Sequence, residues 1–279
     1  MSGAERGAFI RELVAQALWP GKGVHPARRC DARQLFEALN EQPKSHVQHR
    51  EEGELHVFHY NQKVQNTCAW TPELLLARGL IFRRNARTKE TTLVATPWPK
   101  FFNLQEDGYE LEELAEMAKG GRVEVTTKMD GSLGLVFHDG KQWRVTTKGS
   151  FSSDQARWAT AWLKRNVDAE ALQKGATYLV EIIYRENQIV IPYPFQQLVL
   201  LSAFSADGRE LSREELAKVA EASRPKVLRD ATAKPEPQPA PEPEPEPALT
   251  KPRRVGNHDQ PATIGAVYAV PIETPNRSE

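Results

Sequence analysis

The sequence has very little cysteine, no charge imbalance and no long hydrophobic run. Cys30 and Cys68 are its only two cysteines, and they fit neither a disulfide framework nor a zinc-binding spacing. We therefore expect a reduced, cytoplasmic setting. Lys+Arg and Asp+Glu both number 37, so the overall charge gives no argument for nucleic-acid binding. Any surface that binds RNA must be local.

Charged residues also interrupt the apolar stretch near the N-terminus. Arg6, Arg11 and Glu12 lie among the apolar residues of 4–19, which predicts an amphipathic helix rather than a signal peptide or a membrane span. We expect no membrane association. The chain of 279 residues is long enough for one large domain with a substantial core.

The composition changes sharply near the C-terminus. Proline occupies every second position from Pro235 to Pro247, mostly alternating with glutamate. Such a segment predicts an extended, disordered linker that cannot form a packed core. We therefore predict a globular domain at 1–222 and a disordered tail at 223–279, and the proline-rich tail is a candidate for binding a protein partner.

Several elements of the globular part follow from local patterns. Helices are predicted at 31–39, 110–119, 152–165 and 212–222, the last with a capping box. Strands are predicted at 54–60, 77–82, 91–96, 123–127, 177–184 and 197–204 from alternation or apolar runs.

The most informative stretch is KMDGS at 128–132. Asp130-Gly131 is a turn signal, so Lys128 is predicted at the end of the strand before it, facing a tight loop. Two β-prone runs follow, separated by Asp139-Gly140, which is a strong type I′ hairpin signal. With a two-residue loop, position 138 pairs with 141 and position 131 pairs with 148. This register returns Lys148 to the Lys128 loop.

This arrangement suits a nucleophilic lysine. Two ammonium groups and the Asp130 carboxylate would meet beside Gly131. A neighbouring cation or a bound metal lowers the pKa of a lysine and so increases its neutral, nucleophilic fraction. The same cations bind phosphate oxygens. Attack of the Lys128 amine on a nucleoside triphosphate is the reaction that fits best, although a KxDG motif alone also describes an ordinary solvated turn.

Four other residues have two interpretations from the sequence. Tyr60 ends a strand, where it either contacts a ligand or packs with a wet hydroxyl. Arg78 enters an apolar strand, either as a structural ion pair or as a phosphate clamp. Lys100 and Phe102 lie in the shaped loop 97–106, which either binds phosphate and stacks on a base or simply anchors to the core.

A fifth residue is a carboxylate inside an apolar strand. Glu181 lies in the middle of 177–184, where an unpaired charge is costly. Its partner is a metal ion, a ribose hydroxyl or one of the lysines. The sequence does not choose among these three.

In order along the chain, these segments resemble the ATP-dependent RNA ligases of the T-even phage type, the tRNA-repair branch of the covalent nucleotidyltransferases. The resemblance runs from about Leu55 to Leu211. Its matching pieces are HVFHY, ARGLIF, KFFN, KMDGSLG, TTKGS, and YLVEIIY followed by QIVIPY. Together they are far more specific than any one motif.

The resemblance implies a role for each matching residue. Lys128 would take AMP from ATP as a lysyl adenylate, with Asp130 and Gly131 completing that motif and Lys148 returned by the hairpin. Arg78, Lys100 and Phe102 would serve the site from upstream, and Tyr60 ends the first matching piece. Glu181 would be the carboxylate of the nucleotide pocket and a ligand for Mg²⁺.

The resemblance also implies a fold and a reaction. The family fold is α+β, with antiparallel sheets that line a nucleotide cleft. AMP passes from the lysine to an RNA 5′-phosphate, and a 3′-hydroxyl then displaces it, with cleaved tRNA as one candidate substrate. A capping-type or DNA-joining nucleotidyltransferase uses the same lysine chemistry, but the ARGLIF and KFFN pieces favour an RNA ligase.

Two family motifs are missing from the sequence. After Leu211 we find neither an EGxV-like strand nor a KxK-like strand with phosphate-binding lysines. A truncated or degenerate relative, which binds nucleotide or RNA without ligating on its own, is therefore the alternative. Covalent AMP on Lys128 separates the two hypotheses.

Overall fold

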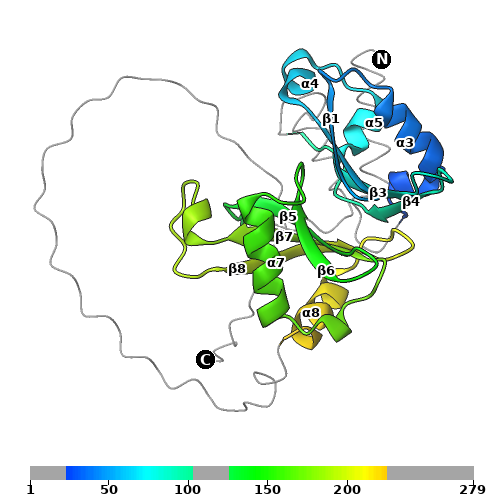
Figure 1. Ribbon diagram of the computed structural model, residues 1–279. Helices are drawn as coiled ribbons and strands as arrows, with labels where there is room; N and C mark the ends of the chain where they lie inside the picture. Colours follow the sequence, from blue (N-terminus) through cyan, green and yellow to red (C-terminus); the bar gives the residue numbers. More distant parts are fainter. Residues whose placement is uncertain (1–22, 103–125, 225–279) are drawn as a thin grey trace, which may run out of the picture.

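The computed structural model describes residues 23–102 and 126–224. Two four-stranded antiparallel sheets form its framework, with strand orders β1-β2-β3-β4 and β6-β5-β7-β8. Figure 1 shows the first sheet with its helices at the upper right and the second sheet with α7 and α8 below it. The mixture of helices and antiparallel sheets confirms the predicted α+β class.

The elements follow the chain in a simple order. The first half contains α2 (Pro26–Arg29), α3 (Ala32–Asn40), β1 (Val47–Glu52), β2 (Leu55–Tyr60), α4 (Gln62–Thr67), α5 (Pro72–Leu76), β3 (Arg78–Arg84) and β4 (Thr91–Ala95). The second half contains β5 (Ser132–His138), β6 (Trp143–Thr147), α7 (Asp154–Asn166), η1 (Ala169–Ala171), β7 (Thr177–Ile183), η2 (Arg185–Asn187), β8 (Gln197–Phe204) and α8 (Arg213–Ala222).

Side-chain caps fix the helix starts as the sequence predicts. Asp31 accepts a hydrogen bond from the backbone N–H of Gln34 at 2.8 Å and begins α3. Ser153 caps α7. Ser212 and Glu215 form the predicted capping box at the start of α8. The predicted helices at 4–19 and 110–119 lie outside the described residues.

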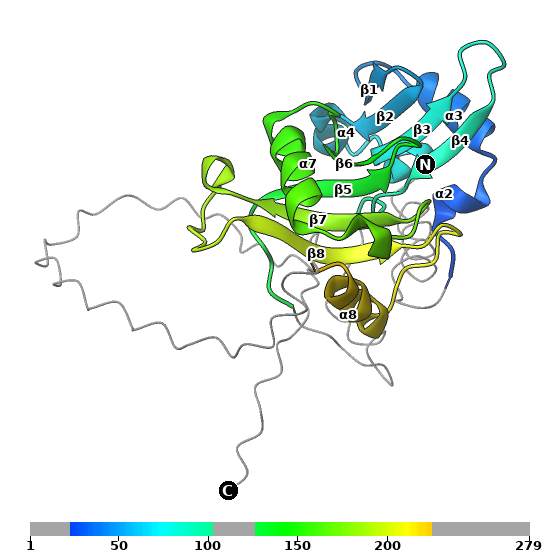
Figure 2. The same cartoon turned by 60° about the horizontal axis from the view of Figure 1, so that its bottom comes forward.

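Each sheet has its own core, and a third core joins the sheets. The first core packs α3 and α5 on β2 and β3, and another packs α7 and α8 on the second sheet. Figure 2 shows α7 lying along one face of that sheet. Between the sheets, Val57 and Ile81 pack against Phe137 and Phe151, and all four are buried. This apolar contact sets the distance at which the two sheets face each other.

Polar contacts reinforce this junction. Arg144 on β6 donates to the Glu52 carboxylate at 2.5 Å, at the turn between β1 and β2. Arg83 on β3 donates to the carbonyl oxygen of Asp139 in the β5–β6 loop. The first sheet therefore contacts the β5–β6 hairpin through side chains from two of its strands.

The predicted register of the hairpin is wrong. The β5–β6 register pairs His138 with Trp143 and Gly134 with Thr147, two residues away from the predicted pairing. The Asp139 carboxylate accepts hydrogen bonds from the N–H groups of Lys141 and Gln142, both at 2.8 Å, and this lengthens the loop. A shift of two residues leaves every side chain on its predicted face, so the hydrophobic pattern does not reveal it.

Of the strand predicted at 123–127, residues 123–125 lie outside the described residues, so that part stays a prediction. Residues 126–131 have no regular secondary structure, and β5 begins at Ser132. Lys128 therefore lies in an irregular segment that leads into a strand, not at the end of one. The disordered tail predicted at 223–279 lies almost entirely outside the described residues, and the domain boundary stays a prediction.

Candidate active site

A cleft of about 540 Å³ opens between the sheets, where β2 and β3 face the β5–β6 hairpin. Its lining includes Arg50, His59, Tyr60, Arg78 and Lys148. Two arginines and a lysine make this a cationic cleft. Such a group of side chains is suited to binding phosphate.

Arg78 is the most constrained of these cations. Its guanidinium carbon lies 4.2 Å from the centre of the Phe101 ring. Burial lowers its pKa, and Tyr60 and Glu181 oppose that effect. Its buried Nη1 has no hydrogen-bond partner among the residues that the structure describes. A buried guanidinium N–H without a partner is a donor available to an anion.

Lys148 faces Arg78 across the cleft because a glycine allows it. Gly79 has a φ of +103°, and a Cβ at this position would lie 2.9 Å from the Lys148 Cα. Burial and the Arg78 charge lower the pKa of Lys148. The charge that adds to burial in lowering the pKa of Lys148 is therefore that of Arg78, whereas the sequence predicts Lys148 beside the Lys128 loop and does not predict its pairing with Arg78.

Glu181 connects the cleft to the KMDG segment. Burial raises the pKa of its carboxyl to about 7, while Lys128, the Gly131 N–H and Arg78 oppose the rise. Lys128 and Arg78 therefore both act on this carboxyl. Across the sheet Glu181 pairs with Leu133 on β5, which brings the KMDG segment and the middle of β7 together.

Gly131 makes this approach possible. A Cβ on Gly131 would lie 2.6 Å from the Ile182 carbonyl oxygen and 3.2 Å from the Glu181 Cγ. No side chain fits in that space, so the glycine is required by close packing. The sequence predicted Gly131 as part of a turn; the structure adds that it packs against β7.

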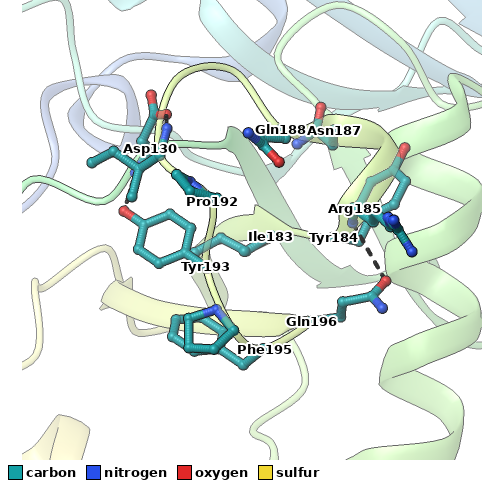
Figure 3. A pocket seen from close by; sticks show the side chains of 12 residues that line it. Asp130, Ile183, Tyr184, Arg185, Asn187, Gln188, Pro192, Tyr193, Phe195 and Gln196 are labelled. Carbon is teal, nitrogen blue, oxygen red and sulfur yellow. Dashed lines mark hydrogen bonds between the residues drawn. The ribbon is translucent and has the colours of Figure 1, made fainter. Parts of the chain in front are cut away.

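Asp130 holds the loop that follows η2 through hydrogen bonds with Val190, Ile191 and Tyr193. Its Oδ2 accepts hydrogen bonds from the N–H groups of Val190 and Ile191 at 2.7 and 2.8 Å. Its own N–H donates to the Tyr193 hydroxyl at 2.9 Å. Figure 3 shows Asp130 and Tyr193 together at one side of a pocket of about 390 Å³. The two amide hydrogen bonds and the Lys128 charge lower the pKa of Asp130.

Lys100 and Phe102 lie on the other side of the cleft wall, among aromatic rings. The Lys100 ammonium donates to the Phe101 carbonyl oxygen at 2.7 Å and lies 4.2 Å from the centre of the Phe102 ring. Phe102 meets Trp70 edge to face at 5.5 Å, and Trp70 meets Tyr60 at 4.8 Å. The aromatic row therefore runs from the KFFN segment to the cleft.

Several residues of this region were not found from the sequence. Trp70 and Phe101 contact the cations, Tyr193 holds Asp130, and His59 lies in the cleft beside Gly149. Three of them stand in pieces already quoted, since Phe101 follows Lys100 in KFFN, His59 precedes Tyr60 in HVFHY and Tyr193 ends QIVIPY. Trp70 and its role had no comparable signal.

These observations define an α+β protein with a cationic cleft, a half-buried carboxyl whose pKa is raised to about 7, and an exposed lysine beside it. A model of the T4-type family described as RNA ligase matches residues 76–232, more than half of the chain. The chain belongs to this RNA ligase family. The matched range includes Arg78, Lys128, Lys148 and Glu181.

A curated relative agrees with this assignment. A protein of Thermovibrio ammonificans named "Putative RNA ligase" is 32% identical over 136 residues, which is 47% of this chain. The alignment covers 34% of that protein, about a third of its length. Within the described ranges, no helix combines the length and hydropathy that crossing a bilayer requires.

Proposed function

We propose that the protein is an ATP-dependent RNA ligase that joins RNA 5′-phosphate and 3′-hydroxyl ends through a lysyl-AMP intermediate. The observation that carries this proposal is the placement of Lys128 beside Glu181. Burial raises the pKa of the Glu181 carboxyl, and the positive charges of Lys128 and of Arg78, which lies on the opposite sheet, both lower it. The action of both charges on this carboxyl supports a site that combines a nucleophile, an oxygen ligand and an anion-binding guanidinium. Membership of the RNA ligase family supports the same conclusion.

The first step transfers AMP to the protein. The neutral amine of Lys128 attacks the α-phosphorus of ATP, a P–N bond forms, and the P–O bond to pyrophosphate breaks. Arg78 and Lys148 supply fixed positive charge where negative charge develops on phosphate oxygens. Because both cations are already partly desolvated, their interaction with phosphate is stronger than in water.

The later steps seal the RNA. A 5′-phosphate oxygen of RNA attacks the lysyl-bound phosphorus, which releases Lys128 and forms an RNA adenylate. A 3′-hydroxyl then attacks the 5′-phosphate, a phosphodiester forms and AMP leaves. Cleaved tRNA is one substrate that presents both ends.

Mg²⁺ fits the residues of this site. It binds one or two protein carboxylates together with substrate phosphates, and Glu181 offers a half-buried carboxyl directly beside the cationic cleft. A bound Mg²⁺ would neutralise charge on the triphosphate. We propose Glu181 as its protein ligand; Asp130 is already occupied by two backbone amides.

Incubation with α-labelled ATP and Mg²⁺, followed by denaturing electrophoresis, tests the proposal. We expect label on the wild type and none on Lys128→Ala. Lys141→Ala is the matched control, because Lys141 is also an exposed lysine of an irregular segment in the same part of the chain. Folded protein without label would contradict autonomous adenylylation.

The missing EGxV and KxK motifs favour a second candidate, a relative that binds nucleotide or RNA without ligating. Pre-adenylated RNA separates the steps, because it needs no lysyl adenylate. Sealing of that RNA without ATP by an unlabelled protein would show a ligase that lacks only the first step. Binding of ATP without label or sealing would support the binding-only relative.

A further inference from the structure

The hairpin of β1 and β2 carries a second group of chemically active side chains on the face away from the cleft. Arg50 and His59 line the cleft. Their neighbours His49 and His56 instead contact the Phe36 ring of α3, at 6.0 and 5.1 Å between ring centres. The hairpin therefore presents one set of residues to the cleft and a different set to α3, as strand alternation requires.

His49, Glu51 and His56 are brought together on this second face. Glu51 lies directly opposite His56 in the β1–β2 register, and His49 lies two positions before Glu51 on the same strand face. His49 Nε2 and His56 Nδ1 are 2.9 Å apart. The ligand atoms of all three residues lie within 4.8 Å of one another.

Aromatic packing fixes both imidazole rings. His49 stacks on Phe58 with 4.2 Å between ring centres and 9° between ring planes. His56 is 9% exposed, and the Phe36 ring lies nearly perpendicular to it. Rings that are held in place before binding lose little further freedom when they coordinate a ligand.

The two facing nitrogens share a hydrogen bond, in which one ring donates and the other accepts. A metal ion would replace this hydrogen bond and bind both nitrogens once the donor ring carries its proton on its other nitrogen. Burial lowers the pKa of both imidazoles, while Glu51 opposes the fall. Neutral imidazole is the form that binds metal.

The positive charge of Arg84 repels a metal ion at this site, but Arg84 already pairs with a carboxylate. Arg84 lowers the pKa of His56 through its charge. The same guanidinium donates to the Glu37 carboxylate at 2.6 Å and lies 4.3 Å from the centre of the Phe36 ring. Its repulsion of a cation at the hairpin is therefore partly offset.

We propose that His49, Glu51 and His56 form a binding site for a divalent transition metal ion of the zinc class. Two imidazoles and one carboxylate, with water in the fourth position, are a set that zinc uses. Tetrahedral bonds of about 2.0–2.1 Å place donor atoms roughly 3.3 Å apart, so the 2.9 Å pair needs only a small widening. The ion would join β1 to β2 behind the cleft wall, outside the ligation chemistry.

Cobalt titration of tag-free, chelator-treated protein tests this site. Co²⁺ in a low-symmetry nitrogen and oxygen site gives visible absorption bands, and Zn²⁺ should abolish them by displacement. We expect one Co²⁺ for each chain. Glu51→Gln and His49→Ala should each weaken binding at least about tenfold, because even residues that only support ligands contribute that much.

Three variants separate loss of the metal site from unfolding and from loss of ligation. Glu51 is exposed, so its substitution leaves the core intact even where a histidine variant unfolds. His46→Ala is the matched control, because His46 precedes the same strand and lies outside the group. Absence of bands in the wild type, or equal Co²⁺ affinity in Glu51→Gln, overturns the proposal. Lys128→Ala should bind Co²⁺ as the wild type does, which separates this test from that of ligation.

Discussion

Gly79 and Lys148 meet backbone to backbone across the two sheets, and a Cβ on Gly79 would lie 2.9 Å from the Lys148 Cα and 3.1 Å from its carbonyl oxygen. We predict that Gly79→Ala destabilises the protein by about 2 kcal/mol or more, because strain at positive φ adds to the steric overlap. It should also slow self-adenylylation by moving Lys148. Urea unfolding and label incorporation measure the two effects.

Gly53→Ala is the control for this prediction. Gly53 also has a positive φ, of +62°, but a Cβ there meets nothing within 4 Å. Its substitution should cost about 1 kcal/mol from the backbone conformation alone and leave label incorporation unchanged. Equal effects of the two substitutions would show that the contact with Lys148 does not matter.

The raised pKa of Glu181 predicts that the free energy of unfolding depends on pH. The carboxyl has a pKa of about 7 in the folded protein against 4.5 ordinarily, so the folded state binds the proton more tightly. The free energy of unfolding should therefore fall as pH rises from 4.5 through about 7. Glu181→Gln removes this loss and should raise stability by up to about 3 kcal/mol above neutrality.

The same substitution should abolish label incorporation if Glu181 serves the nucleotide. Unfolding curves at acid and alkaline pH, run beside the labelling assay, measure both effects. Glu186→Gln is the control, because Glu186 is exposed and should change neither. A variant whose stability gain is the same at every pH would refute the raised pKa.

The hydrogen bonds of Asp130 predict how fast the backbone amides of the loop at 189–191 exchange with solvent. Without its carboxylate, the N–H groups of Val190 and Ile191 lose their acceptor. Hydrogen exchange at these two amides should therefore accelerate in Asp130→Ala by tenfold or more, for a lost interaction of about 1.5–3 kcal/mol. Asp130→Asn keeps one acceptor oxygen and should show a smaller effect. Unchanged exchange in the alanine variant would contradict the described contact.

We predict that self-adenylylation requires the planar guanidinium of Arg78. Lysine keeps the charge but loses the flat contact with Phe101 and the N–H groups of the guanidinium. We expect Arg78→Lys to lower the rate of label incorporation by about 10²-fold, as removal of one fixed donor does elsewhere. Arg87→Lys, at an exposed turn arginine, should have no effect. Wild-type rates in Arg78→Lys would assign Arg78 a structural role.

Patterns of a few residues predicted the local elements well, because their causes are local. The Asp31 cap, the capping box of Ser212 and the alternation of 54–60 each reflect interactions within one element. The hairpin register failed because an Asp139 side chain, not the Asp-Gly backbone alone, decides the loop length.

Contacts between distant segments could not be predicted in the same way. The sequence singled out Lys148 and Arg78 separately, but the pairing of these two depends on how the sheets pack around Val57 and Phe137. Asp130 was expected beside Lys148, yet its carboxylate satisfies two amides sixty residues further along the chain. Nothing within either segment specifies such a partner.

The two carboxyls of the site have pKa values shifted in opposite directions. Hydrogen bonds and Lys128 hold the pKa of Asp130 below its ordinary 3.8, whereas burial brings that of Glu181 to about 7. Near neutrality the Asp130 carboxylate therefore stays ionised and keeps its hydrogen bonds to the loop, while the Glu181 carboxyl gains or loses its proton as the pH changes. A pH profile measured there would report the charge of the cleft without the loop opening at the same time.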